Sequence, residues 1–440
     1  MSRDDTPPAP TPPTGTGPGS LGTAAAAGPG PAPRSGPAVA TVEVPPSWRN
    51  WSGGLCFQPA GIARPDSVDQ LCRIVRQTAA RGGCVRPVGA GHSSAPLVRT
   101  DDLLLSVDRL PSGVLGTPAD GQAWVGAGTR LHELGDLLRR HGLAMPNLGD
   151  VDTQAIAGAI GTGTHGSGRG LSNLSAMVTG VRLVTAAGQV IEIDGEREPD
   201  VLRAVQLSLG VLGVLTAVRT RVVPAFQARR REWGLPTDEC LAVFDALLDA
   251  NRNVDFYWYP RRDDAHLRTV NPVDDDPGPA RLPATDCTED RVGWSGSALT
   301  KRRSLRFHEI EYAVPAAAGP ACFQELRHRI RIRHRQHAAW RVLYRYVAAD
   351  HAYLSPAYGR DSVTISVHQN ETSPYQEFFA DVEPIFHAYG GRPHWAKIHH
   401  LEGRDLLSRY PEADRFLTVR HRLDPDGVFL SDYLRRLLAL

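Results

Sequence analysis

Residues 85–94 read VRPVGAGHSS, and residues 159–168 read AIGTGTHGSG. Both stretches are rich in glycine and small residues, and each has a histidine beside a serine or threonine. Glycine allows the backbone to approach a ligand closely, and the N–H groups of such loops bind phosphate. Two loops of this kind, about seventy residues apart in one region, indicate a site for a phosphate-bearing cofactor.

The second stretch also contains a literal G-x-G-x-x-G, the spacing of the dinucleotide-binding loop in the Rossmann fold. That loop follows a β-strand, and an acidic residue about 20 positions later binds the ribose. Here residues 153–158 are small and interrupted by glycine, and residues 185–188 read TAAG, without an acid. The spacing therefore does not predict a Rossmann-type NAD site.

The segments around these loops alternate between helical and extended patterns. Apolar residues at helical spacing, turn residues and capping residues predict the boundaries. The predicted elements are a helix over 67–83 capped by Ser67, strands at 84–88, 103–107, 123–125 and 218–223, a helix capped by Thr129 that ends at His141, and a hairpin of 181–185 with 190–193. The first half of the chain is therefore expected to be α+β.

Composition divides the chain into four segments. Residues 1–44 are rich in Pro, Ala, Gly and Thr, so we expect a disordered tail. Residues 45–225 hold the glycine-rich loops and form the first domain. Residues 226–390, with their charged clusters and aromatic strands, form a second domain. Residues 391–440 are expected to pack back on the first domain.

Whole-chain properties limit the possible partners. The 440 residues carry a formal net charge of +1, which provides no general attraction for nucleic acid. No apolar run approaches the roughly 18 residues that a membrane span needs. The six cysteines are scattered without a C-x-x-C pair, which is typical of reduced thiols and favours a cytoplasmic location.

Several ordered blocks together resemble a known family. Residues 85–94, LSVD at 105–108, GTGTHGSG and SLGVLGVLTAV resemble the FAD-binding domain of the vanillyl-alcohol-oxidase superfamily. LSPAYGRDS at 354–362 and HWAK at 394–397 resemble its sugar-lactone and alditol oxidase branch, over about residues 48–436 in all. The resemblance implies a PCMH-type FAD-binding domain of two α/β subdomains and an α+β substrate cap domain with an antiparallel sheet.

The same resemblance implies how FAD is bound. His92 is the expected attachment point for the 8α-methyl carbon of the flavin, although its ring could instead only pack beside the flavin. The expected cofactor contacts are Gly89, Ala90, Gly91, His92, Ser93, Gly158, Gly161, Thr162, Thr164, His165, Gly166, Gly213, Val214 and Lys397.

The implied reaction is oxidation of an alcohol carbon, with hydride transfer to flavin N5. Arg345 and Lys397 are the expected cations beside flavin and substrate. Family members commonly have Glu-x-Arg where this chain has Leu343-Tyr344-Arg345, and leucine can neither take a proton nor accept a hydrogen bond. His368, or a histidine of residues 394–400, is therefore the expected proton acceptor.

The substrate is expected to be a small alcohol, lactone or alditol, with oxygen as the acceptor that yields hydrogen peroxide. A dehydrogenase, an enzyme for a secondary-metabolite alcohol, and a flavin-binding module without oxidase activity stay open because of Leu343. The spacing of His394, His399 and His400 matches no common zinc signature, so no metal is expected. The basic run 327–335 is expected to form a partly buried helix and not a nucleic-acid surface.

Overall fold

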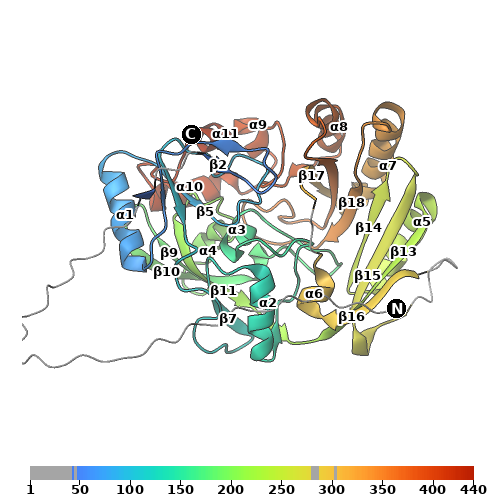
Figure 1. Cartoon of the computed structure of the whole chain (residues 1–440), viewed down its shortest axis with the longest axis horizontal. Helices are drawn as coiled ribbons and strands as arrows, with labels where there is room; N and C mark the ends of the chain where they lie inside the picture. Colours follow the sequence, from blue (N-terminus) through green and yellow to red (C-terminus); the bar gives the residue numbers. More distant parts are fainter. Residues whose placement is uncertain (1–41, 44–46, 279–286, 302–304) are drawn as a thin grey trace, which may run out of the picture. The chain divides into compact units, whose positions relative to one another are not determined.

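The structure is a computed structural model that describes residues 42–43, 47–278, 287–301 and 305–440 (Figure 1). Residues Ala40–Leu440 form one compact unit. The predicted tail at 1–44 lies outside the described residues, except for Val42–Glu43. Within the described ranges, no helix is both long and apolar enough to cross a bilayer.

The first sheet carries the first glycine-rich loop. Its strands, in spatial order, are β1 (Val42–Glu43), β4 (Gly61–Ala63), β6 (Leu103–Ser106) and β5 (Val85–Val88). Strands β4 and β5 both run parallel to β6. Helix α1 (Val68–Ala80) lies between β4 and β5 in sequence, and the Ser67 side chain accepts a hydrogen bond from the Gln70 N–H, as predicted for an N-cap.

The second sheet is antiparallel. Its order is β10 (Val190–Asp194), β9 (Val178–Val184), β11 (Val214–Arg221) and β7 (Gln122–Gly126), which confirms the predicted hairpin. Helix α2 (Leu131–Arg140) is preceded by Arg130 at the N-cap, so the prediction of a Thr129 cap is wrong. The Thr129 hydroxyl instead donates to the Gly126 carbonyl at 2.7 Å and accepts from the Gly113 N–H at 2.7 Å.

Short elements complete this half. They are β2 (Trp48–Arg49) paired with β3 (Cys56–Phe57), β8 (Leu143–Ala144) paired with β12 (Val223–Pro224), α3 (Ile156–Gly161) and α4 (Pro199–Val205).

The third sheet has eight strands, and every neighbouring pair is antiparallel. Its order is β16 (Cys287–Trp294), β13 (Gln227–Pro236), β15 (Asp264–Pro272), β14 (Asn253–Tyr259), β18 (Val342–Val347), β19 (Ser362–Asn370), β17 (Phe307–Pro315) and β20 (Arg392–Pro393). Helices α5 (Thr237–Ala250), α7 (Gly319–Arg329) and α8 (Gln376–Ala388) share one hydrophobic core with it (Figure 1). Helix α6 (Ser295–Leu299) follows β16. These sheets and helices confirm the α+β prediction.

The pleat of this sheet positions the candidate site. On β17, Ile310 and Tyr312 belong to the core that the helices cover. Because successive side chains of a strand point to opposite faces, Glu309 and Glu311 face the other way. Strand β18 places Arg345 on this second face by the same alternation, since its neighbour Tyr344 lies in the core.

The C-terminal segment shares a core with the first two sheets. Trp395 and Phe429 belong to the same buried cluster as Leu105 and Val181. The N–H of Val85 donates to the carbonyl of residue 428 at 2.8 Å. The helices of this segment are α9 (Gly403–Leu407), α10 (Ala413–Leu423) and α11 (Asp432–Leu437).

Candidate active site

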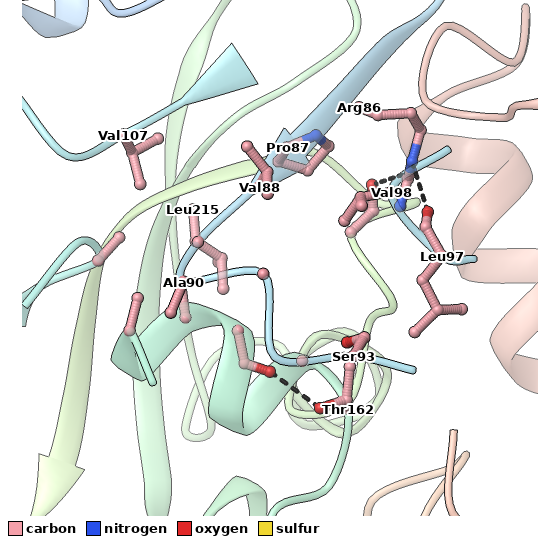
Figure 2. A pocket seen from close by; sticks show the side chains of 18 of the residues that line it. Arg86, Pro87, Val88, Ala90, Ser93, Leu97, Val98, Val107, Thr162 and Leu215 are labelled. Atoms are coloured by element: carbon pink, nitrogen blue, oxygen red, sulfur yellow. Dashed lines mark hydrogen bonds between the residues drawn. The ribbon is translucent and has the colours of Figure 1, made fainter. Parts of the chain in front are cut away.

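A cavity lies where the loop after β5 meets α3 and the loop before β11 (Figure 2). We call it the glycine-lined cavity. The residues of the cofactor prediction that line it are Gly89, Ala90, Gly91, His92, Ser93, Gly158, Gly161, Thr162, Gly213 and Val214. Two loops that are far apart in sequence therefore form one wall, as the sequence suggested.

Two of these glycines cannot be replaced without strain. Gly91 has φ +69°, and a Cβ there would lie 3.0 Å from the ring of Trp48. Gly213 has φ +146°, and a Cβ would lie 2.6 Å from the Leu183 side chain. Side chains at both positions would oppose the backbone conformation and collide with neighbours. The loop shapes thus depend on glycine.

The glycine-lined cavity has no carboxylate among the described residues of its wall. It does contain Arg86, which is 1% exposed. Among the described residues, the guanidinium donates to the carbonyl oxygens of Leu97, Leu209, Gly210 and Phe429. Burial lowers the pKa of Arg86 to about 10, against smaller opposing effects of Cys84 and Asp424, so the group stays charged at neutral pH. A positive wall with small side chains suits an anionic ligand such as a diphosphate.

A second cavity adjoins the first and shares His92 and Gln154 with it. We call it the charged cavity. The predicted site residues Thr164, His165, Arg345, His368 and Lys397 line it, whereas Gly166 lines neither cavity. Thr164, His165 and Lys397 thus belong to the charged cavity and not to the glycine-lined wall.

One end of the charged cavity is organised by Glu311. Its carboxylate accepts hydrogen bonds from Arg345 at 3.2 Å, and Oε1 lies 2.5 Å from Nε2 of His165. Burial raises the pKa of the Glu311 carboxyl, but Arg345 and His165 outweigh burial and hold that pKa well below its usual range. Nε of Arg345 is buried and has no hydrogen-bond partner among the described residues.

The other end is organised by Glu309. Its Oε2 accepts a short hydrogen bond from Lys397 Nζ, and its Oε1 lies 3.4 Å from Nε2 of His368. Burial raises the pKa of the Glu309 carboxyl, whereas Lys397 and His368 lower it, with a net pKa of about 2. Glu309 and Glu311 therefore each hold one cation and face one histidine.

Sequence reasoning missed both carboxylates. The signal was present in residues 307–314, FHEIEYAV, because the apolar residues Ile310, Tyr312 and Val314 predict a strand with one apolar face. Glu309 and Glu311 then fall together on the opposite face. Leu343 does line the charged cavity, but the two carboxylates of β17 mean that the cavity does not lack acids.

His92 lies at the junction of the two cavities. Its ring stacks on Trp51 with 4.8 Å between centroids, and its Nε2 lies 2.6 Å from Oγ1 of Thr153. Burial, with the charges of Lys397 and Arg130, lowers the pKa of His92 to about 4. The imidazole is therefore neutral at physiological pH, with Nε2 engaged and Nδ1 left for other contacts.

The remaining histidines and the basic run have other surroundings. His394 lines the charged cavity, and its Nδ1 accepts from the Ala396 N–H at 3.1 Å. Across the described ranges, no group of three metal-ligating side chains could hold a metal ion. In the basic run, Arg327 bonds Asp238 and Asp263. Its guanidinium is therefore neutralised within the protein.

The glycine-lined cavity fits FAD. Its wall offers backbone groups, the hydroxyls of Ser93, Thr162 and Ser208, and the charge of Arg86. His92 connects this cavity to the charged one, so a ring bound beside His92 would border a polar, enclosed space.

Comparisons with known proteins agree with this arrangement. Residues 59–194 match the FAD binding domain family, and residues 218–294 and 284–437 match the D-arabinono-1,4-lactone oxidase family. The chain is 35% identical to an L-gulono-1,4-lactone dehydrogenase of Mycobacterium tuberculosis, over 90% of this chain and 99% of that protein. It is 29% identical to an alditol oxidase of a Streptomyces species, over 88% of this chain and 98% of that protein.

A solved structure shares the fold. Cholesterol oxidase from B. sterolicum superposes with a TM-score of 0.79 at 17% sequence identity, covering 94% of this chain and 100% of that one. The predicted PCMH-type architecture is thereby confirmed, and FAD is the cofactor of the chain. The chain belongs to the D-arabinono-1,4-lactone oxidase family, in the sugar-lactone and alditol branch of the vanillyl-alcohol-oxidase superfamily.

Proposed function

We propose that this protein oxidises an alcohol carbon of a sugar-derived lactone or alditol, with FAD in the glycine-lined cavity and the substrate in the charged cavity. The observation that carries the proposal is the shared boundary of the two cavities at His92 and Gln154. A cofactor ring at that boundary would meet a substrate held by Arg345, Lys397 and His368. The names of the lactone dehydrogenase and alditol oxidase relatives support the substrate class.

Two parts of the chain hold the two molecules in this proposal. Residues 45–225 form the FAD domain, residues 226–390 form the cap, and residues 391–440 supply Lys397. Gly89, Gly91, Ser93, Gly158 and Thr162 contact the diphosphate and ring through backbone groups and hydroxyls. When bound, FAD accepts the hydride that leaves the alcohol carbon.

The charged cavity orients the alcohol and takes its proton. The free Nε–H of Arg345 donates to a substrate oxygen, and the Lys397 ammonium stabilises negative charge near the reacting carbon. Nε2 of His368 accepts the proton from the alcohol oxygen. Since Arg345 and Lys397 are paired with carboxylates, the cavity favours uncharged polyols and lactones.

We also propose that FAD is attached covalently through His92. The Thr153 hydroxyl is within hydrogen-bond distance of Nε2 of His92, so Nδ1 is the nitrogen available for a covalent bond to the flavin. Denaturation in acid followed by in-gel fluorescence tests the attachment. Fluorescence that stays with the polypeptide, and is lost in His92→Ala, supports the tether, and flavin released into the supernatant contradicts it.

Oxygen is the proposed electron acceptor, and the cytoplasm is the proposed location, which the six unpaired cysteines support. Turnover of L-gulono-1,4-lactone, D-arabinono-1,4-lactone and xylitol by the purified protein tests the function. Hydrogen peroxide and reduction of an added dye are measured in parallel. Peroxide formed in step with substrate loss supports an oxidase. Dye reduction without peroxide would show that the electron acceptor is not oxygen. If no substrate is consumed in either assay, the proposed reaction is contradicted.

A further inference from the structure

The two carboxylates of β17 occupy equivalent positions but hold their histidines differently. Oε1 of Glu311 lies 2.5 Å from Nε2 of His165, within hydrogen-bond distance. At Glu309, the 3.4 Å distance from Oε1 to Nε2 of His368 exceeds the usual hydrogen-bond range of about 2.7–3.2 Å. The contact between Glu309 and His368 is therefore longer and weaker than the contact between Glu311 and His165.

The backbone selects the tautomer of His368. Its Nδ1 lies 3.0 Å from the carbonyl oxygen of Arg341. A carbonyl oxygen can only accept, so Nδ1 carries the hydrogen in the neutral ring. Nε2 then has a lone pair, on the edge of the ring that faces Glu309, in a side chain that lines the charged cavity.

We propose that Glu309 is a positioning residue for the proton transfer: it holds the charge that stabilises His368 once Nε2 has taken the alcohol proton. The inference rests on the proposed function, because the proton comes from the alcohol substrate. The O–H bond breaks and leaves its electron pair on the oxygen, while the lone pair of Nε2 forms the new N–H bond. His368 gains one positive charge beside the carboxylate.

Lys397 gives Glu309 the properties that this task needs. Oε2 is bonded to Nζ of Lys397, which fixes the carboxylate and leaves Oε1 turned to His368. Because Lys397 keeps the carboxylate ionised at neutral pH, Oε1 can stabilise an imidazolium in an environment where burial would otherwise oppose the charge. The carboxylate that stabilises His368 thus comes from β17. The position on β18 that faces the cavity is Leu343, which carries no charge.

Other charged groups of the cavity also act on His368. They come from the elements around the cavity and are Glu309 and Glu311 on β17, Arg345 on β18, Lys397 and His394 after β20, and Asp150, His165 and His92 in the loops of the first half. Of these, Glu309 is the anion that lies within 4 Å of Nε2. Its removal should therefore change the protonation of His368 more than a distant substitution does.

The first experiment observes His368 without turnover. The FAD-loaded protein is labelled with ¹⁵N-histidine, and the signal missing in His368→Gln is assigned to His368. At high pH we expect the Nδ1–H tautomer. In Glu309→Gln we expect protonation of the ring to require a pH about one unit lower, because an opposite charge has been removed. Glu325→Gln, which removes a carboxylate outside both cavities, should leave the titration unchanged.

If Glu309→Gln does not fold, Glu309→Gln is combined with Lys397→Met, and the double variant is compared with Lys397→Met alone, so that the two proteins differ only in the Glu309 carboxylate. An Nε2–H tautomer in the neutral ring would overturn the inference. So would a titration that is the same with and without the Glu309 carboxylate.

The second experiment uses the pH profile of kcat/KM for the best lactone or alditol. Glu309→Gln should move the acid limb about one pH unit lower and reduce kcat, whereas a purely structural role would reduce activity at all pH values alike. In a His368→Gln background, Glu309→Gln should produce no further shift of the limb, and a shift there would overturn the inference. Absence of turnover in the wild type would contradict the proposed function alone, since the NMR titration would still decide the role of Glu309.

Discussion

The glycine-lined and charged cavities meet at His92 but are built in different ways. The glycine-lined cavity is formed mainly by short loops of small residues that come together from distant parts of the sequence, and its described wall has no carboxylate. The charged cavity is formed by side chains from three strands and several loops, and two of its carboxylates, Glu309 and Glu311, neutralise Lys397 and Arg345. Backbone shape thus serves to bind the cofactor, and paired charges serve to bind and deprotonate the substrate.

The largest effect is expected from a substitution in the charged cavity, which should impair the reaction without impairing the binding of FAD. Lys397→Met removes a cation from the charged cavity and should lower kcat about 100-fold, the scale of losing one electrostatic donor. Its FAD content, measured by absorbance at equal protein concentration, should match the wild type. Lys301→Met is a control because Lys301 lies outside both cavities. Loss of FAD in Lys397→Met would contradict the division between the cavities.

A substitution at Gly91 should have the opposite effect, because it should weaken the binding of FAD in the glycine-lined cavity. Gly91→Ala places a Cβ against Trp48 at positive φ, so the loop must shift, and the FAD content of the purified protein, measured by absorbance, should fall to about half or less of the wild-type content. Gly82 has the same φ of +69°, but a Cβ added there would have no atom within 4 Å, so Gly82→Ala carries the same backbone cost away from the cavity. Equal FAD loss in the two variants would show that backbone strain, and not the cavity wall, is responsible.

A third change tests whether the charged cavity already has the acids it needs. Leu343→Glu adds a carboxylate to a cavity that already contains Asp150, Glu309 and Glu311, and the burial should cost about 1–3 kcal/mol in unfolding free energy. Leu343→Met should cost less than about 1.5 kcal/mol. Denaturant unfolding measures both. Lactone turnover should fall in Leu343→Glu, and a rise above the wild type would mean that a carboxylate on β18 is required after all.

The smallest expected effect is on acid stability. Burial lowers the pKa of His92 to about 4 and that of His394 to about 3, each from an ordinary value of 6.5. Between the ordinary pKa of 6.5 and the lowered pKa of each histidine, the unfolded chain binds protons that the folded protein does not. The free energy of unfolding should therefore fall as the pH drops below about 6.5. The melting temperature should decrease by roughly a few degrees from pH 7.5 to pH 5. His394→Gln should reduce this difference, and an unchanged difference would contradict the assignment.

The two cavities also differ in how far the sequence alone predicts them. The segment from Gly89 to Ser93 is continuous in sequence, so its resemblance to a family motif was enough to name it as one candidate wall. The pairing of Glu309 with Lys397 joins residues 88 positions apart and depends on which strands become neighbours, and no local pattern encodes that choice. The Thr129 cap failed for a related reason, because a tertiary partner, the N–H of Gly113, competes for the hydroxyl.

The most direct test of the account is the visible spectrum of the purified protein during anaerobic addition of L-gulono-1,4-lactone, D-arabinono-1,4-lactone or xylitol. We expect a yellow protein whose flavin absorbance is bleached by at least one of the three and returns when an electron acceptor is admitted. A yellow protein that none of them bleaches would contradict the assignment of the charged cavity. A colourless protein that cannot be loaded with FAD would contradict the assignment of both.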